Sequence, residues 1–578
     1  MTDKIIAFTS GGGSTDEVPI TVQGDSMGTI KEGDWCTIEI SNEETLSKYL
    51  VAGTTNNLIA RNEEEENNQS YYDFSRSRTT IEDLNKGHTL KGRTRKTAYL
   101  NGTFRAKSVL EVIVGEKPRA LSRLPRPIPS DEIVKGFGKF VEYLKELKDM
   151  TKYMKFGHLL SKSDGKNIEN FLAIPNFIKS SKHFGFFADT GNGKSSIFGY
   201  FANKLLVTTI SLLIIDPKSE FFNGSLISTK NLVSKAKEAG RKVYNISIFN
   251  NIYFDSTELN FKKLLKALSV FTETNFIRFP SGQNKKAFLH KFTEIVFRDV
   301  PDICEYSFTE NDVTRILKEF TDDSVATSVY RTEEPKTTFI NEVTEFLKDS
   351  IKVGFVTKNL NNLLNCLKKD SNKISIEYLV KNIFLLKEDG EIPLIFINFS
   401  SKEKLQGWIQ ENYMNFIISE ITSVMNETLQ DPDIEKVEAL FCVDEANKYF
   451  PSENPAHNSF IETSIKSLNE ILNHWGRSKG FGVALACPDP TQLDSEILGR
   501  IKKKCLFLGY GLKSSFLNDI SSRTDISDAK ELEKIDPLVE DENGLLESCQ
   551  FFMVGMKSLL DESGKGMVIE LTKKDFEE

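Results

Sequence analysis

The sequence is poor in the residues that build metal centres and covalent cross-links. Its 578 residues include only seven cysteines and six histidines. The cysteines are scattered without paired spacing, at Cys36, Cys304, Cys366, Cys442, Cys487, Cys505 and Cys549. This distribution argues against a zinc site, a disulfide framework and a metal centre built from histidine. We therefore expect a protein of a reducing compartment.

Long apolar runs and an excess of positive charge are also missing. No uninterrupted hydrophobic segment approaches the length of a membrane span, and the first residues, Met1-Thr2-Asp3-Lys4, lack a secretory pattern. We therefore expect a cytoplasmic protein without membrane contact. The formal net charge is −9, so the chain as a whole is not a polycation that coats nucleic acid. Any DNA would have to meet a local basic surface, such as the lining of a pore.

The length allows roughly two to four domains, and hydrophobic patterns divide the chain into five segments. Strand-like runs with glycine turns predict a small β-barrel-like domain over residues 1–120. Residues 121–155 predict a proline-punctuated linker and a helix from about Asp131 to Met150. Strands alternate with helices in residues 156–283 and 389–578, which predicts an α/β core in two parts, ending in a pair of C-terminal edge strands. Residues 284–388 between them predict a helical insertion.

A glycine-bearing turn between an apolar run and a helix indicates phosphate chemistry. Phe184 to Phe187 predict a buried strand, and Ile197 to Val207 have helical spacing. A loop in this position surrounds phosphate oxygens with backbone N–H groups and the positive end of a helix. Taken alone, the motif also fits a turn before an ordinary surface helix. The residues expected to bind ATP are Thr190, Gly191, Asn192, Gly193, Lys194, Ser195 and Ser196.

Two residues of this loop have more specific expected roles. The Lys194 ammonium would reach the β- and γ-phosphates and act in catalysis. The Ser195 hydroxyl would ligate Mg²⁺.

A second apolar run ends in a pair of carboxylates. Ala439 to Val443 predict a buried strand, and Asp444 and Glu445 follow it directly. Ligands of open α/β sheets sit at this carboxyl end of the strands. Asp444 suits a ligand of Mg²⁺, directly or through water, and Glu445 suits the general base that polarises the attacking water. The alternative is an Asp–Glu pair that caps the next helix.

Three further polar residues leave two interpretations open. Asp216 and Glu220 follow the predicted strand from Ile210 to Ile215, where they could orient the metal-bound water or the catalytic lysine, or cap a helix. Arg477 precedes another predicted strand. Its guanidinium could stabilise charge on the γ-phosphate of a neighbouring subunit. Residue chemistry alone favours a solvated arginine at a helix end.

With these residues in view, the chain resembles the HerA branch of the HerA/FtsK superfamily of ring-forming DNA-pumping ATPases. The resemblance spans roughly residues 156–509 and depends on five segments in the family's order. They are Ala188–Ser195, Asp216–Phe221, Val443–Ala446, Gly476–Gly482 and Pro490–Asp494. The resemblance implies a RecA-like P-loop ATPase core of the α/β class, with a parallel-rich central sheet, an N-terminal small β-barrel and a helical insertion. It also implies that Arg477 is an arginine finger.

Three positions depart from the family pattern. Ala188 stands where the phosphate loop has its first glycine, and Ser219 replaces the glycine of the segment after the second strand. Pro488 falls where the family has a sensor glutamine. Slow or partner-dependent hydrolysis is expected from these departures.

The resemblance further implies a function. It predicts a homo-hexameric ring that hydrolyses ATP to translocate or unwind double-stranded DNA and that activates a partner effector. The effector would be a nuclease or a sirtuin-like NAD-consuming protein, and the setting anti-phage defence. One alternative is a nucleotide-binding scaffold ring with little translocation, and another is a conjugation or secretion motor. A kinase or small-molecule P-loop enzyme fits least, because the paired carboxylates and Arg477 would then share no explanation.

Overall fold

The computed structural model describes most of the chain. The described residues are 5–10, 14–23, 34–42, 47–62, 98–121, 123–130, 132–147, 153–159, 168–173, 183–271, 282–300, 302–387, 390–399, 407–454, 458–521, 535–540, 542, 546–556, 558, 560 and 566–577. Two compact units emerge, residues 1–197 with 501–578 and residues 198–500. Each unit is described by itself.

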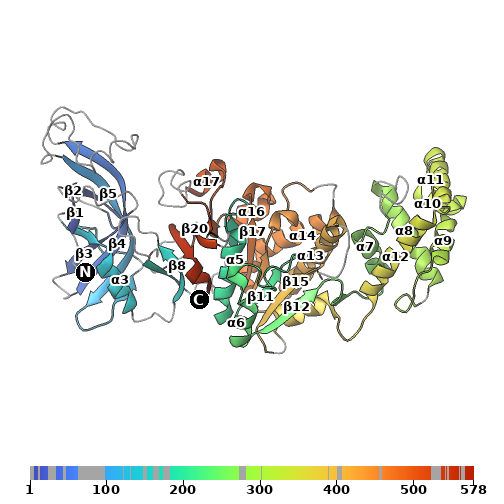
Figure 1. Ribbon diagram of the computed structural model, residues 1–578, viewed down its shortest axis with the longest axis horizontal. Coiled ribbons are helices and arrows are strands. Elements are labelled where there is room, and N and C mark those ends of the chain that lie inside the picture. The colour runs from blue at the N-terminus through green and yellow to red at the C-terminus, as the bar shows by residue number, and fades with distance from the viewer. Residues whose placement is uncertain are drawn as a thin grey trace. The chain divides into compact units, whose positions relative to one another are not determined.

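The first unit begins with a closed antiparallel barrel (Figure 1). Six strands follow one another in the order β2-β1-β7-β3-β4-β5, and pairing of β2 with β5 closes the ring. Val18, Ile20 and Val22 alternate along β2 and are fully buried, which is the period of two expected for a strand with one face inside a barrel. The strands of this sheet are β1 (Ile5–Thr9), β2 (Glu17–Gln23), β3 (Trp35–Asn42), β4 (Ser47–Asn62), β5 (Ala98–Ile113), β6 (Arg119–Leu121) and β7 (Ile133–Gly136).

A strand occupies the first part of the helix expected from about Asp131. Ile133 to Gly136 form β7, which pairs with both β1 and β3. The helix α3 (Gly138–Lys145) begins only after it. Burial of Val134 in the barrel core explains the difference, because a cross-strand contact outweighs local helical spacing. The strands of the barrel therefore continue past residue 120.

The same unit contains the strand that carries the phosphate loop. Strand β10 pairs in parallel with β18, and β18 pairs antiparallel with β20. β20 then lies between β18 and β21, and β21 lies between β20 and β8, so the two C-terminal strands pair as expected but neither is an edge strand. The further elements are β8 (Tyr153–Leu159), β9 (Ile168–Ala173), β10 (Phe184–Phe187), β18 (Cys505–Leu508), α17 (Ser514–Ser521), β19 (Val539–Glu540), β20 (Leu546–Val554), β21 (Met567–Thr572) and α18 (Lys573–Glu577).

The second unit contains five neighbouring parallel strands, in the order β12-β15-β11-β16-β17. The residues of β11, β15, β16 and β17 are all buried, as expected for parallel strands covered on both faces. The strands are β11 (Ser211–Ile215), β12 (Lys242–Ser247), β15 (Pro393–Asn398), β16 (Ala439–Val443) and β17 (Phe481–Cys487). The helices of this core are α5 (Lys194–Lys204), η6 (Leu205–Val207), η7 (Ile227–Thr229), α6 (Leu232–Glu238), α13 (Gly407–Gln430), η10 (Ala446–Lys448), α14 (Ser459–Glu470), η12 (Ile471–Trp475), α15 (Gly476–Lys479), η13 (Pro490–Gln492) and α16 (Ser495–Ile501). Helix α5 begins in the first unit, and helix α16 ends in it.

The helical insertion has a phenylalanine core. The ring of Phe288 contacts those of Phe271, Phe292, Phe320 and Phe339 at centroid distances of 4.8–6.1 Å. Helices α8 to α12 gather around this core (Figure 1). Two short parallel strands, β13 and β14, stand where the insertion leaves and re-enters the core. Its elements are β13 (Ile252–Tyr253), α7 (Glu258–Ala267), α8 (Gly282–Asp299), α9 (Glu310–Lys318), η8 (Glu319–Thr321), α10 (Asp323–Val329), α11 (Glu333–Phe346), α12 (Ser350–Leu367), β14 (Ile374–Ser375) and the π-helix η9 (Tyr378–Leu385).

The expected fold class is confirmed. The chain is an α/β protein with a parallel-rich sheet, an N-terminal closed barrel and a helical insertion. Among the described helices, none combines the length and the apolar character needed to cross a membrane.

Candidate functional site

The phosphate loop joins a buried strand to a helix. All four residues of β10 are buried, and α5 begins at Lys194. Gly191 has φ +84° and Gly193 has φ +77°, a left-handed conformation that glycine adopts without a Cβ clash. A Cβ built on Gly191 would have no described atom within 4 Å. A ligand could therefore approach the backbone closely at Gly191.

Gly193, the other glycine of the loop, packs against the C-terminal segment of the same unit. A Cβ on Gly193 would lie 3.2 Å from Leu538 Cδ1 and 3.3 Å from Cys549 Cβ. The backbone N–H of Leu538 also donates to Asn192 Oδ1 at 3.5 Å. The loop therefore has one open glycine and one glycine pressed against β20 and the residues before β19.

Hydrogen bonds of Asp189 hold the start of the loop. Its backbone N–H donates to the carbonyl of Tyr510 at 2.9 Å, and its carbonyl accepts from the N–H of Asn192 at 3.1 Å. Its carboxylate accepts from the N–H of Thr190 at 2.7 Å. Gly511, with φ +84°, allows the close approach, because a Cβ there would lie 2.6 Å from Asp189 Cβ. The turn after β18 thus supports the loop after β10.

The first turn of α5 has the electrostatic character that phosphate requires. Lys194 is only 6% exposed, and the first turn contains no acidic residue. The N–H of Ile197 donates to the Gly193 carbonyl at 3.0 Å, so the helical hydrogen bonds begin within the motif. The first turn itself therefore places no carboxylate at the positive end of the helix, as suits an anion site. The Ser195 hydroxyl in this turn is an oxygen donor of the kind Mg²⁺ prefers.

The carboxylate pair stands at the end of β16 in strained backbone. Asp444 is 6% exposed, and its Oδ1 accepts from the N–H of Glu445 at 2.8 Å. Glu445 has φ +55° and ψ +39° and precedes η10, but its side chain makes no capping hydrogen bond. The helix-capping interpretation therefore does not hold for Glu445. A left-handed non-glycine residue costs about 1–2 kcal/mol, which makes this position a functional candidate.

Negative charge gathers around this strand end. Burial raises the pKa of Tyr449 well above its usual range, and the carboxylates of Glu411, Glu445 and Asp444 raise it further. One counter-charge is near, because Lys448 Nζ lies 3.4 Å from Glu445 Oε2. The second unit thus presents carboxylate oxygens, including the buried Asp444, that suit a hard divalent cation.

The Asp216 side chain stabilises the turn that follows β11. Its side chain is buried and accepts from the N–H groups of Glu220 at 2.8 Å, Phe221 at 3.1 Å and Phe222 at 3.0 Å. Burial raises its pKa to about 6, although the three backbone donors act in the opposite direction. Ser219, with φ +58°, stands in the same turn at the position where the family has glycine. The next described helix, η7, begins only at Ile227, so Asp216 stabilises a turn and is not the expected helix cap.

A polar link between two loops is absent from the sequence-based predictions. Asn447 Nδ2 donates to Gln492 Oε1 at 2.9 Å, joining the loop after β16 to the segment after β17. Ser452 N donates to the Gln492 carbonyl at 2.7 Å, and a β-bridge pairs Pro451 with Leu493. The family pattern places its glutamine at Pro488, so Gln492 drew no attention. The only sequence signal was a glutamine within the segment already matched to the sensor.

Arg477 belongs to the short helix α15. Its backbone is part of that helix, whereas its side chain lies outside what the structure describes. The next lysine anchors the helix, because Lys479 Nζ donates to the carbonyls of Asp431 at 2.9 Å and of Ile434. Gly480, with φ +71°, ends the helix before β17. The backbone therefore places Arg477 in a firmly tied turn.

The structure brings the expected residues together in two groups. Thr190 to Ser196 form one loop and helix start, and Asp444 and Glu445 share one strand end. The loop belongs to the first compact unit, and the carboxylates and Arg477 belong to the second.

Comparison with known families matches the middle of the chain. Residues 154–433, just under half of the chain, match the family model described as "Helicase HerA, central domain". The matched segment contains the phosphate loop and Asp216, whereas Asp444, Glu445 and Arg477 lie beyond its end. Comparison with curated proteins gives no match.

Several solved structures share parts of the fold at low identity. The plasmid coupling protein TrwB, in complex with the non-hydrolysable GTP analogue GDPNP, is 13% identical, with a TM-score of 0.37 over 75% of this chain and 92% of that chain. The pCW3 conjugation coupling protein TcpA, a monomer form with ATPgS, is 10% identical, with a TM-score of 0.25 over 92% and 86%. The genome packaging NTPase B204 from Sulfolobus turreted icosahedral virus 2, in complex with AMPPCP, is 12% identical, with a TM-score of 0.20 over 34% and 70%.

With TM-scores below 0.5, these likenesses assign neither activity nor partner to this chain. The family match is the stronger finding, and it coincides with the strand, loop and helix that carry the phosphate motif. Residues 154–433 are therefore similar to the central domain of the HerA helicase family, a likeness that supports a HerA-type ATPase.

Proposed function

We propose that this protein binds ATP with Mg²⁺ at the phosphate loop and uses hydrolysis to move double-stranded DNA through a ring of identical subunits. The observation that carries the proposal is the phosphate loop itself. It combines an open left-handed glycine, a buried lysine and a helix start free of acidic residues within the HerA segment.

In this proposal the loop binds the phosphates of ATP. The backbone from Thr190 to Ser196 surrounds the phosphate oxygens, with Gly191 allowing the closest approach. Lys194 neutralises the β- and γ-phosphates, because a buried ammonium is strongly favoured by an anion beside it. Ser195 and Asp444 would hold Mg²⁺, which supplies charge neutralisation to the phosphates.

Glu445 acts as the general base. It is the more exposed of the two carboxylates. Its strained backbone is explained if the side chain is held in place for chemistry. Its ion pair with Lys448 orients Oε2, and in this proposal the carboxylate accepts a hydrogen bond from the attacking water. Gln492, linked to Asn447, is a positioning residue in place of the family's glutamine, since Pro488 has no side-chain donor.

Arg477 completes the site of a neighbouring subunit. Its short helix is tied down by Lys479, which gives a guanidinium on that helix a defined base. A finger acts only across a subunit interface, so the proposal requires a closed ring, for which we propose a homo-hexamer. Activation of a nuclease or sirtuin-like partner, and a role in anti-phage defence, depend on the family resemblance alone.

A triplex-displacement assay tests the proposal. The wild-type chain with ATP should strip a third strand from duplex DNA, and Glu445→Gln subunits should not. Arg477→Ala subunits should bind ATP without hydrolysing it, and mixing them with Glu445→Gln subunits should restore part of the activity at mixed interfaces. Slow ATP consumption without strand displacement would instead favour the scaffold ring. No rescue at any mixing ratio would contradict a finger acting in trans.

A further inference from the structure

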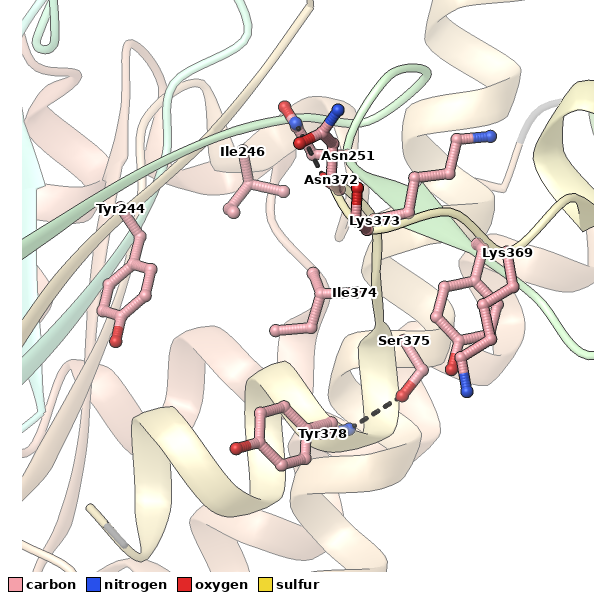
Figure 2. A pocket seen from close by; sticks show the side chains of 11 residues that line it. Tyr244, Ile246, Asn251, Lys369, Asn372, Lys373, Ile374, Ser375 and Tyr378 are labelled. Carbon is pink, nitrogen blue, oxygen red and sulfur yellow. Dashed lines mark hydrogen bonds between the residues drawn. The ribbon is translucent and has the colours of Figure 1, made fainter. Parts of the chain in front are cut away.

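A second pocket lies at the base of the helical insertion, and we call it the neck pocket. It has a volume of about 580 Å³ and is lined by β12, β13, β14, the loop before β14 and the start of η9. Figure 2 shows the rings of Tyr244 and Tyr378 on two sides of a space into which Ile246 and Ile374 point. The volume falls within the range of about 300–1,000 Å³ typical of ligand sites.

Hydrogen bonds that do not use the open space hold the walls of this pocket. Asn251 is central, because its Oδ1 accepts from Ser247 N at 2.9 Å and its Nδ2 donates to the Asn372 carbonyl at 3.3 Å. Its carbonyl accepts from Ile374 N at 2.8 Å. Ser375 Oγ accepts from Tyr378 N at 3.2 Å and so fixes the start of η9 (Figure 2). The walls are therefore in place without a ligand.

The lining combines aromatic rings with positive charge. Tyr244, Tyr253 and Tyr378 contribute three rings, and Tyr378 is 45% exposed although it is a large aromatic residue. Lys369 Nζ lies 5.5 Å from the centre of the Tyr253 ring, and Lys373 also lines the pocket. None of the described lining residues is acidic. The pocket thus favours a ligand that is both flat and anionic.

The carboxylate that follows Lys369 in the sequence is engaged in its own turn. Asp370 stands beside Lys369 in the sequence, but its Oδ1 accepts from Asn372 N at 2.7 Å, within its own turn. Lys373 Nζ donates to the Asn365 carbonyl, which neutralises no charge. Figure 2 shows the Lys373 side chain pointing away from the space between Tyr244 and Tyr378, so the proposal places the phosphate beside Lys369.

Rings and ammonium groups in one recess match the chemistry of a nucleotide. Nucleic-acid bases stack on aromatic side chains with little regard to sequence, at about 1–3 kcal/mol per base, and lysines attract the phosphate that accompanies each base. An extended peptide on the outer edge of β12 would use backbone groups and would not need three rings and two lysines.

We propose that the neck pocket binds a nucleotide unit, a base stacked on Tyr378 with its phosphate beside Lys369. Two sources could supply this unit, a single-stranded segment of nucleic acid or a free nucleotide. The site is separate from the phosphate loop, and it holds no group assigned above to hydrolysis.

The test uses the full-length chain in a Lys194→Ala background with EDTA, so that nucleotide bound at the phosphate loop contributes nothing. The probe is a fluorescein-labelled twelve-nucleotide oligothymidylate, followed by fluorescence anisotropy, with a labelled duplex of the same length as a second probe. Tyr378→Ala should weaken oligothymidylate binding about tenfold, the loss of one stacked base. Tyr378→Phe keeps the ring and should bind as the unaltered background does.

Charge variants make the second half of the test. Lys369→Glu should weaken binding about tenfold and lower the dependence of log K on log salt by about one. Lys237→Glu, at an exposed position of α6 outside the pocket, is the matched control and should change neither quantity by as much. Duplex binding should be unaffected by Tyr378→Ala.

Three outcomes decide the proposal. Competition by thymidine monophosphate would identify a free nucleotide as the ligand, and binding that resists this competitor would identify the strand. Oligothymidylate binding that is unchanged in both Tyr378→Ala and Lys369→Glu, with thermal unfolding midpoints equal to that of the background, would overturn it.

Discussion

The loop after β10 and the loop after β16 leave parallel strands in the same manner but with different residues. Both turn through left-handed backbone, the first at Gly191 and Gly193 and the second at Glu445. Glycine takes this conformation at little cost, whereas a residue with a Cβ loses about 1–2 kcal/mol. The first loop needs only backbone at its turn. The second keeps a side chain that its backbone disfavours, which agrees with the proposal that the carboxylate itself is needed.

Ser219 has the same backbone strain, but hydrogen bonds of its neighbours offset it. Its φ of +58° is close to that of Glu445. Its N–H donates to the Asp216 carbonyl at 2.9 Å, and the Asp216 carboxylate accepts from the three N–H groups that follow. These contacts account for the turn at Ser219, whereas for the turn at Glu445 we propose a functional reason.

The largest expected effect is the loss of ATP turnover when Lys194, which follows Gly193, is replaced. Lys194→Ala should lower steady-state phosphate release from ATP by at least about 100-fold, because removal of one preorganised charge from a phosphate site costs that much or more. Lys204→Ala, at the other end of α5, is the control and should keep its turnover. Turnover by Lys194→Ala at the wild-type rate would refute the assigned role of Lys194 and show that the loop after β10 is not needed for hydrolysis.

Glycine at the strained strand end tests the comparison directly. Glu445→Gly should abolish turnover and yet raise the free energy of unfolding by about 0.5–1 kcal/mol, because the strain is released. Glu445→Gln should abolish turnover without this gain, and Ser219→Gly should gain stability and keep turnover. Denaturant unfolding and ATPase rates measure both. A Glu445→Gly chain less stable than the wild type would mean that the left-handed turn is not strained.

The two glycines of the phosphate loop should respond unequally to a methyl group. Gly193→Ala meets both the backbone penalty and the 3.2–3.3 Å contacts with Leu538 and Cys549, and should cost about 2–3 kcal/mol. Gly191→Ala meets open space and should cost about 1 kcal/mol. Thermal unfolding of the two variants checks the order. Equal losses would show that the C-terminal segment does not support the loop.

A pH dependence of stability is expected at the Asp216 turn. Burial raises the pKa of Asp216 from 3.8 to about 6, so the folded chain holds a proton that the unfolded chain has released. The contribution to stability is therefore full below pH 4 and falls as pH rises toward 6. From pH 4 to pH 7 the unfolding midpoint of the wild type should fall by a few degrees relative to Asp216→Asn. A constant difference between the two would contradict the raised pKa.

Residues that act through their immediate neighbours were predictable. The loop from Thr190 to Ser196 is one contiguous segment, and its strand, turn and helix follow from local patterns. Asp444 and Glu445 were found in the same way, at the end of one apolar run. The strain at Glu445 was not predictable, because φ is set by how η10 must leave the strand.

Residues that depend on distant partners escaped the sequence-based predictions. Asn447 and Gln492 are 45 positions apart, and only the packing of two loops joins them. Ile133 to Gly136 have a pattern that local spacing assigned to a helix, and pairing with β1 and β3 made them a strand. The neck pocket assembles Tyr244, Lys369 and Tyr378 from segments separated by the whole insertion.

The sequence by itself determined the phosphate loop, the carboxylate pair and the order of α/β core, barrel and insertion, because each is encoded by neighbouring residues with a definite spacing. Only the tertiary structure decided that β20 and β21 are internal strands, that Asp216 stabilises a turn and that Glu445 has a left-handed backbone conformation. These features arise from contacts between segments far apart in the chain, and hydrophobic periodicity carries no information about such pairs.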